Sequence, residues 1–254
     1  MILCVDAGNT NIVLGGYEDG RLVFQSRVAT QAALEADQYA LQLEGVLSLH
    51  RAPRPLGAIL SSVVPQVTAA LCGALQLLCG VPPLVLSRAL CPQLPICIYD
   101  PDELGADLIA GAVAARVRCR MPAIVIDMGT ATKLTALDAQ GAVQGVSILP
   151  GMMVSLNALI SGASQLSAVA TQAPTRAIGK NSAESIQSGI VLGTADLLDG
   201  MIARFEAELG GPADVVATGG LAGLVVPHCR RRIPVVPHLL LDGLYEVYRS
   251  HMQP

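Results

Sequence analysis

The chain has 254 residues, of which 52% are hydrophobic and 14% are charged, and its formal net charge is −4. This composition is typical of a well-buried globular protein and argues against a disordered chain, while the length allows one large domain or two of ordinary size. The slightly acidic balance gives no reason to expect a nucleic-acid-binding surface.

Seven cysteines are scattered along the chain without a C-x-x-C pair. They favour buried thiols in a reducing compartment, the cytoplasm, over a disulfide framework or a zinc site. Two long stretches, 55–87 and 139–175, carry no charge, but Pro, Gly and polar residues interrupt both, so we expect no membrane span. The N-terminus lacks a basic region and reaches Asp6 at once, unlike a signal peptide.

The first half of the chain is predicted to alternate strands and helices. A short apolar strand runs into Asp6, and Asp19-Gly20 is a hairpin signal between the next two strands. Apolar residues at helical spacing predict the helices, one of which opens at Pro65. The predicted strands are 2–5, 12–17, 22–26, 58–64 and 84–87, and the predicted helices are 33–49, 65–78 and 104–118.

The second half is predicted to repeat this order. An apolar strand again runs into an aspartate, Asp127, and a second hairpin turns at Gln140-Gly141. The order predicts an α/β architecture with mixed sheets and two domains, 1–118 and 119–254. The predicted strands are 123–127, 133–138, 143–148 and 215–217, and the predicted helices are 152–161, 183–208 (one helix or two) and 239–250.

The two Asp-x-Gly turns indicate an internal duplication that builds a nucleotide cleft. Asp6 and Asp127 lie 121 residues apart, and each is followed by a glycine fourteen residues later, Gly20 and Gly141. Glycine lets the backbone approach a phosphate, and an aspartate at the strand end makes sense if Mg²⁺ lies between them. One such turn alone is usually only a turn, but two at matched positions suit a triphosphate.

Two further features are candidates for the site. Thr218-Gly219-Gly220 follows a strand, where glycines would admit a flat nucleoside or simply open a helix. Asp107 lies among small apolar residues after Gly105-Ala106, so its carboxylate could accept a proton from a substrate hydroxyl. The alternative for Asp107 is a helix cap or a buried hydrogen-bonding group.

Several short motifs follow one another along the chain and together carry a resemblance. The chain resembles a type III pantothenate kinase over nearly its whole length; that family belongs to the acetate kinase, sugar kinase, heat-shock chaperone and actin superfamily. The motifs are D-x-G-N-T at 6–10, S-S-V-V-P at 61–65, P-x-x-L-G-A-D at 101–107, D-x-G-T-A-T at 127–132, P-G at 150–151, G-K-N-S at 179–182 and T-G-G at 218–220.

The resemblance implies a duplicated actin-like (ribonuclease H-like) ATPase fold, in which two similar domains with mixed sheets flank a nucleotide cleft. It implies transfer of the γ-phosphoryl group of ATP to the primary hydroxyl of pantothenate, the first step of coenzyme A biosynthesis. The implied cofactors are Mg²⁺ and a monovalent cation, K⁺ or NH₄⁺. The implied assembly is a homodimer with the pantothenate pocket near the subunit interface, with no nucleic-acid or membrane partner.

The resemblance also implies a role for each matching residue. Asp6 would hold Mg²⁺, Asp127 would bind the monovalent cation, and Asp107 would be the general base. Gly105 and Ser182 would help to line the pantothenate pocket. The nucleotide contacts would come from Gly8, Asn9 and Thr10 in a first phosphate loop, Gly129, Thr130 and Thr132 in a second, and Gly219 and Gly220 against the adenosine.

The chain departs from the family pattern at a few positions, chiefly Leu108, where the family commonly has Arg directly after the base. A missing cation should weaken binding of an anionic substrate, unless Arg116 or Lys180 supplies the charge. Two alternatives stay open: a non-catalytic nucleotide-binding regulatory homologue, and a kinase of another small hydroxy acid. The remaining departures are Gly145-Val146 for Gly-Gly and Asp100 for Asn, with Tyr99 one residue nearer the base than the family's tyrosine.

Overall fold

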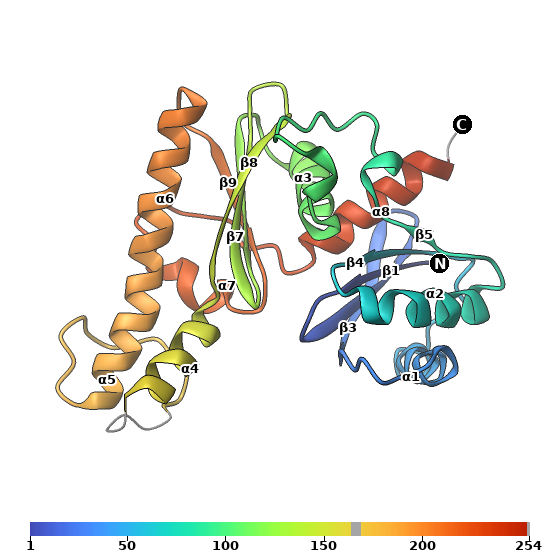
Figure 1. The fold of residues 1–254 in the computed structure, drawn as a ribbon, viewed down its shortest axis with the longest axis horizontal. Coiled ribbons are helices and arrows are strands. Elements are labelled where there is room, and N and C mark those ends of the chain that lie inside the picture. The colour runs from blue at the N-terminus through green and yellow to red at the C-terminus, as the bar shows by residue number, and fades with distance from the viewer. Residues whose placement is uncertain (164–168, 253–254) are drawn as a thin grey trace. The chain divides into compact units, whose positions relative to one another are not determined.

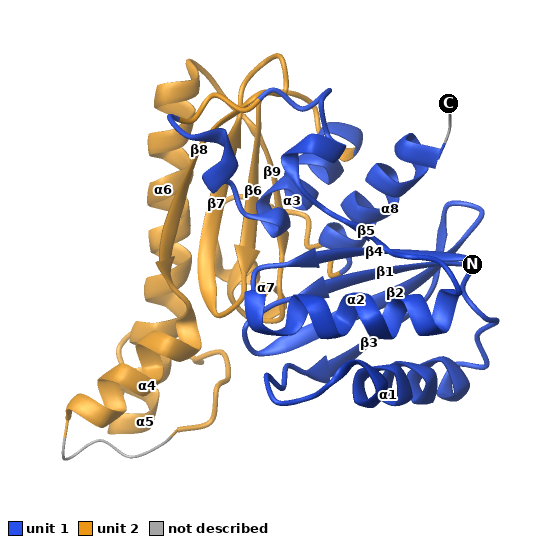
Figure 2. Ribbon diagram, turned by 45° about the vertical axis from the view of Figure 1, so that its right-hand side comes forward, with its two compact units in different colours: residues 1–95, 99–117, 238–254 blue, residues 96–98, 118–237 orange. Residues whose placement is uncertain are grey.

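The computed structural model describes residues 1–163 and 169–252, which form two compact units. Unit 1 consists of residues 1–95, 99–117 and 238–254, and unit 2 of residues 96–98 and 118–237 (Figure 2). The expected halves, 1–118 and 119–254, match this division in the middle of the chain. They differ from it at the C-terminal end, which packs with unit 1.

Unit 1 is built on a five-stranded mixed sheet in the order β3-β2-β1-β4-β5. The central strand β1 pairs antiparallel with β2 and parallel with β4. Asp19 and Gly20 both have positive φ, 48° and 80°, which is the backbone geometry expected of the predicted Asp-Gly hairpin. The strands are β1 (Ile2–Ala7), β2 (Asn11–Glu18), β3 (Arg21–Ala29), β4 (Gly57–Ser62) and β5 (Leu84–Val85).

Helices α1 (Ala36–Leu49) and α2 (Pro65–Cys79) lie side by side on one face of this sheet (Figure 1). Their apolar sides bury Tyr39, Leu43 and Leu71 in a core with alternate residues of β1 and β4. Since side chains alternate along a strand, the residues between these core positions point to the opposite face. The core residues of β1 are Leu3, Val5 and Ala7, so Cys4 and Asp6 point away from α1 and α2.

The opposite face of the sheet carries α8 (Leu239–Met252), at the C-terminal end of the chain. The Tyr17 hydroxyl of β2 donates to Oδ1 of Asp242 at 2.6 Å, and the Tyr17 ring stacks on Tyr245 with centroids 4.6 Å apart. Gly243 lies directly against the backbone of Ala110 in α3 (Ala106–Arg118), where a Cβ atom would not fit. These contacts explain why the last helix belongs to unit 1.

Unit 2 repeats the central part of this design with a four-stranded mixed sheet in the order β8-β7-β6-β9. β6 pairs antiparallel with β7 and parallel with β9, just as β1 does with β2 and β4. This repetition supports the internal duplication expected from the two Asp-x-Gly turns. The strands are β6 (Ala123–Met128), β7 (Ala131–Leu137), β8 (Val143–Pro150) and β9 (Asp214–Thr218).

The helices of unit 2 form a core on one face of its sheet. Leu198 and Ile202 of α6 pack there with Ile124, Ile126 and Met128 of β6, so Asp127 points to the other face. The predicted helix 183–208 is a helical run interrupted by a π-helical segment, Ser188–Leu192. The helices are α4 (Met152–Gly162), α5 (Ser182–Gln187), α6 (Gly193–Leu209) and α7 (Ala222–Val225).

Every strand and every helix predicted from the sequence is present, with ends that differ by a few residues. The two mixed sheets with their flanking helices confirm the α/β prediction.

Candidate functional site

The first Asp-x-Gly turn lies where β1 ends in unit 1. Asp6 and Ser61 are opposite one another in the parallel pair β1·β4, and the buried Ser61 hydroxyl donates to Oδ1 of Asp6 at 2.8 Å. The turn is closed by the Gly8 amide, which donates to the Asn11 carbonyl oxygen at 3.0 Å. The structure therefore holds a carboxylate beside a short glycine turn, at the edge where parallel strands end.

The side of this turn is braced by the end of β3. The Thr30 hydroxyl donates to the Gly8 carbonyl oxygen at 2.6 Å, and the Thr30 amide donates to the Thr10 carbonyl oxygen at 3.0 Å. Asn9 and Thr10 are exposed at the tip of the turn. Their amides and side chains can therefore meet a ligand while the turn itself stays fixed.

Asp107 lies in the first turn of α3 and is only 8% exposed. Its Oδ1 accepts a hydrogen bond from the amide of the next residue, Leu108, at 2.8 Å, and a carboxylate in the first turn of a helix is also favoured by the helix dipole. A Cβ atom on Gly105 would lie 2.8 Å from that oxygen, so Gly105 leaves room for the carboxylate. The contact with the Leu108 amide is thus a local helix contact of Asp107, and it is compatible with a catalytic role.

Unit 1 brings Asp107 to the same sheet edge as Asp6. The Val63 amide, just after β4, donates to the Ala7 carbonyl oxygen at 3.1 Å. The Cγ1 atom of the same valine lies 3.8 Å from where a Gly105 Cβ would be. The segment just before Asp107 therefore lies near Val63, which is itself hydrogen-bonded to the end of β1.

Arg116 does not supply the cation that Leu108 lacks. It lies nine residues beyond Asp107 in α3, which is about 13 Å along the helix axis. One of its guanidinium nitrogens donates to the Gln93 carbonyl oxygen at 2.5 Å. Lys180, the other residue considered for this charge, lies in unit 2.

The second Asp-x-Gly turn lies where β6 ends in unit 2. The Gly129 amide donates to the Ala131 carbonyl oxygen at 3.1 Å, so this turn is one residue shorter than the first. Gly129 and Thr130 are exposed, and Thr132 is buried at the start of β7. Opposite Asp127, β9 places the buried Thr218.

Asp127 forms an ion pair with Lys133, a residue that the sequence reasoning did not single out. The two are directly opposite in the antiparallel pair β6·β7, and Nζ of Lys133 lies 2.9 Å from Oδ2 of Asp127. Both side chains are largely buried, 16% exposed for Lys133 and 14% for Asp127. The sequence did contain a signal for this pair, because a hairpin that turns just after Gly129 places residue 133 opposite residue 127.

Two glycines support the second turn from neighbouring segments. Gly219 has a φ of +97°, and a Cβ atom there would lie 2.5 Å from the Met128 carbonyl oxygen. The Gly151 amide donates to the Thr130 carbonyl oxygen at 3.1 Å, and a Cβ on Gly151 would lie 2.6 Å from the Gly129 carbonyl oxygen. Gly220 is exposed beside Gly219. The T-G-G and P-G motifs thus pack against the turn in unit 2.

Ser182 is the first residue of α5 and is exposed. The preceding Asn181 caps this helix, since its side-chain oxygen accepts a hydrogen bond from the Glu184 amide at 2.9 Å. Asn181 therefore fixes the start of α5, and among the described contacts none defines a pocket at Ser182.

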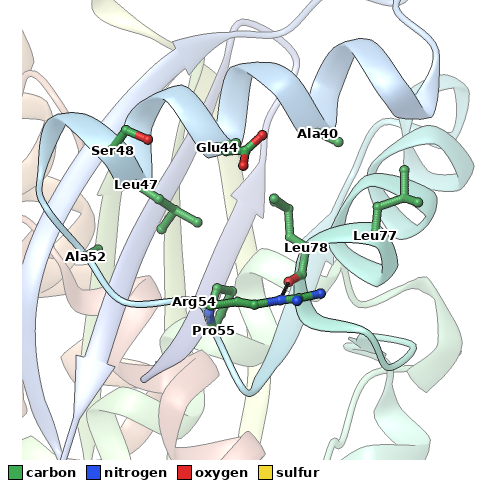
Figure 3. Close-up of a pocket in the computed structure, with 9 residues that line it drawn as sticks. All are labelled: Ala40, Glu44, Leu47, Ser48, Ala52, Arg54, Pro55, Leu77 and Leu78. Carbon is green, nitrogen blue, oxygen red and sulfur yellow. Dashed lines mark hydrogen bonds between the residues drawn. The ribbon is translucent and has the colours of Figure 1, made fainter.

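A cavity of about 440 Å³ lies elsewhere in unit 1, between α1, α2 and the segment that leads into β4 (Figure 3). Arg54 extends across it, and its Nε donates to the Leu78 carbonyl oxygen at 2.8 Å. Because α2 follows β4 and runs back along it, Leu78 lies at the edge where the strands begin. Ligands of α/β sheets bind where parallel strands end, so this cavity is separate from the Asp6 turn.

Each helix within residues 1–163 and 169–252 is too short or too polar to cross a membrane.

Comparison with known proteins places the chain among characterised families. The family model described as "Type III pantothenate kinase" matches residues 2–204. A type III pantothenate kinase of Thermomicrobium roseum is 41% identical over 255 residues, which cover 99% of this chain and 98% of that protein. One from Moorella thermoacetica is 40% identical over 256 residues, covering 99% of this chain and 100% of that protein.

Solved structures show the fold at much lower identity. A Campylobacter jejuni protein assigned to the Baf family of transcriptional activators aligns with a TM-score of 0.63 at 16% identity, covering 98% of both chains. The activator of 2-hydroxyisocaproyl-CoA dehydratase from Clostridium difficile aligns with a TM-score of 0.57 at 12% identity, covering 100% of this chain and 97% of that one. These likenesses confirm the actin-like ATPase fold.

Proposed function

Because the chain belongs to the type III pantothenate kinase family, we propose that it transfers the γ-phosphoryl group of ATP to the primary hydroxyl of pantothenate, the first step of coenzyme A biosynthesis. The observation that carries this proposal is that Gly105, two residues before Asp107, lies near Val63, which is hydrogen-bonded to the end of β1 beside Asp6. A phosphoryl transfer needs a metal-held triphosphate and a base close to one another, and this arrangement supports such a site.

Asp107 is the proposed general base. Its carboxylate would accept the proton of the pantothenate hydroxyl as that oxygen forms a bond to the γ-phosphorus and the bond to the ADP oxygen breaks. Its burial supports this role, since a carboxylate shielded from water interacts more strongly with the group it faces. Gly105 contributes by leaving room for the carboxylate.

Asp6 is the proposed Mg²⁺ ligand, and its surroundings fit that ion. Mg²⁺ is commonly held by one or two carboxylates together with substrate phosphates and water, so a single carboxylate beside a glycine turn is sufficient. Within the described ranges no group of three or more His, Cys, Asp or Glu side chains forms an all-protein cage. Mg²⁺, when bound, would neutralise charge on the β- and γ-phosphates.

The remaining roles are proposals of the same kind. Gly8, Asn9 and Thr10 would bind phosphate in unit 1, and Gly129, Thr130 and Thr132 would do so in unit 2. Gly219 and Gly220 would lie against the adenosine. Gly105 and Ser182 would line the pantothenate pocket of a cytoplasmic homodimer. The family resemblance also implies K⁺ or NH₄⁺ beside Asp127.

The test is ATP-dependent phosphorylation of pantothenate by the purified protein with Mg²⁺, followed as ADP release and as 4′-phosphopantothenate formed. Asp107→Asn should lower kcat by about 10²- to 10⁴-fold while leaving the fold intact. Asp102→Asn is the matched control, because Asp102 is exposed in the segment before α3 and pairs only with Arg88 among the contacts described. Undiminished turnover of Asp107→Asn would remove the assigned base.

Leu108 favours a second candidate, a non-catalytic homologue that binds nucleotide and acts as a regulator. Leu108→Arg restores the family's cation beside the base. If this variant phosphorylates pantothenate and the natural chain only binds ATP, the regulatory candidate is correct. A screen of small hydroxy acids in which another acceptor exceeds pantothenate would instead identify a kinase with a different substrate.

A further inference from the structure

The Asp127–Lys133 ion pair places a fixed positive charge inside the second Asp-x-Gly turn. Nζ of Lys133 lies 2.9 Å from Oδ2 of Asp127, and the antiparallel register of β6 and β7 holds the two residues directly opposite each other. The low exposure of both side chains distinguishes this pair from the ion pairs on the surface of the protein. It is therefore a built-in feature of the turn.

The first turn has an apolar residue at the corresponding position on its neighbouring strand. Asp6 lies opposite Val13 in the pair β1·β2, which is the position that corresponds to Lys133. The residue type at 133 is also unusual for this chain, because Lys133 and Lys180 are its lysines and the rest of its 16 Lys and Arg residues are arginines. An ammonium group is a compact point charge, whereas a guanidinium is a broad planar one, so only lysine resembles a small monovalent cation.

A free monovalent cation does not fit beside Asp127. One carboxylate oxygen already accepts the ammonium of Lys133, and the charges of the pair cancel. A second unit positive charge bound to the same carboxylate would repel Nζ at close range, and the low solvent exposure would screen this repulsion only weakly. The residues present therefore disagree with the K⁺ or NH₄⁺ site that the family resemblance implies.

Building on the proposed function, we infer that the ammonium group of Lys133 takes the place of the monovalent cation beside Asp127, so that this chain turns over without added K⁺ or NH₄⁺. The charge that other proteins would draw from solution is here attached to β7. Because it is covalently attached, this positive charge stays beside Asp127 whichever salt is in the buffer.

The first experiment compares turnover in K⁺, NH₄⁺, Na⁺ and Tris buffers at equal ionic strength, with Mg²⁺ and ATP held constant. The natural chain should vary by less than about twofold among the four buffers, since its own cation is already bound. An activation of about tenfold or more by K⁺ or NH₄⁺ over Tris would overturn the inference, since one missing electrostatic contact in an active site costs about 10²- to 10³-fold.

The second experiment uses Lys133→Met, which removes the charge and keeps the unbranched stem. Its turnover in Tris should fall by about tenfold or more, and K⁺ or NH₄⁺ should restore most of it. Arg231→Met is the matched control, because it breaks another ion pair of unit 2, Arg231–Glu206 at 2.7 Å, away from the turn. That variant should show no K⁺-specific recovery.

Thermal unfolding gives a readout that does not depend on catalysis. Replacing Na⁺ with K⁺ or NH₄⁺ should raise the Tm of Lys133→Met by about 4 °C or more and leave the natural chain and Arg231→Met unchanged. If Lys133→Met responds to K⁺ in neither turnover nor Tm, the inference is wrong. If no variant phosphorylates pantothenate in any buffer, the proposed function fails, and the Tm comparison alone still decides whether Lys133 replaces a cation.

Discussion

The two Asp-x-Gly turns share a backbone design and differ in the residue that lies opposite each aspartate on the neighbouring strand. In unit 1 the Ser61 hydroxyl donates to Asp6, and Val13 lies opposite on the neighbouring strand. In unit 2 the same strand-turn-strand arrangement places the Lys133 ammonium against Asp127. The residue opposite the aspartate on the neighbouring strand is therefore apolar in unit 1 and a cation in unit 2. Duplication has thus kept the geometry and changed the electrostatics.

Among the substitutions that compare the two turns, the largest effect should come from removing the charge of the first turn. Asp6→Asn should lower kcat/KM by about 10²- to 10³-fold and raise the Mg²⁺ concentration needed for half-maximal rate, because the proposed ligand charge is lost. Steady-state kinetics across a Mg²⁺ series would measure both. Asp19→Asn, in the exposed hairpin turn of unit 1, is the control, since asparagine tolerates the positive φ found there.

Removing the charge of the second turn should act on stability. Asp127→Asn leaves the largely buried Lys133 without its carboxylate, which should cost about 3 kcal/mol of unfolding free energy in urea titrations. Asp6→Asn should cost less than about 1 kcal/mol, because a serine hydroxyl can donate to an amide oxygen as well. Equal losses in the two variants would contradict the contrast between the turns.

Replacing a glycine by alanine should lower the unfolding free energy by different amounts in the two turns. Gly219→Ala places a Cβ atom 2.5 Å from the Met128 carbonyl oxygen at a φ of +97°, and it should lower the unfolding free energy by about 2 kcal/mol. Gly8→Ala should cost less, because its Cβ would meet only the Asn11 carbonyl oxygen at 3.3 Å and its φ is not positive. Urea unfolding of both variants would give the difference, and a larger loss for Gly8→Ala would count against it.

A charge transplant would make the first turn resemble the second. Val13→Lys puts an ammonium opposite Asp6, and by competing with Mg²⁺ it should weaken binding of Mg²⁺-ATP by about tenfold. Calorimetric titration with Mg²⁺ and a non-hydrolysable ATP analogue would measure the change. Val13→Met, which adds length without charge, is the control, and equal affinity for the two variants would show that the charge opposite Asp6 has no effect.

The smallest effect concerns an ordinary ion pair of unit 2. Burial alone would raise the pKa of Glu206, but hydrogen bonds from the Ala213 amide and Arg231, together with the Arg231 charge, lower it below its usual value of 4.5. Stability from this pair is therefore present above pH 4.5 and is lost as the pH falls through the lowered pKa. Glu206→Gln should cost less than about 1 kcal/mol at pH 7 and nothing in strong acid, as unfolding at both pH values would show.

Much of the fold could be predicted because the signals are local. Strand alternation, the Asp-Gly hairpin and the opening proline of α2 each act over a few residues. The role of Lys133 was missed because its pairing with Asp127 depends on the register between two strands, which a hydropathy pattern does not reveal. The packing of α8 on unit 1 was missed for a similar reason, since it rests on Tyr17 and Asp242, which lie 225 positions apart.

The docking of α8 on β1 and β2 also sets the order in which the two units can complete their folding during synthesis. The strands of unit 1 leave the ribosome first, yet the helix that covers their second face is made after all of unit 2. Residues 118–237 can reach nearly all of their native contacts while β1 still exposes Cys4, which is buried in the finished protein. The unit that begins the chain is therefore the last to be completed, and a polypeptide cut short before α8 would carry an uncovered apolar sheet face.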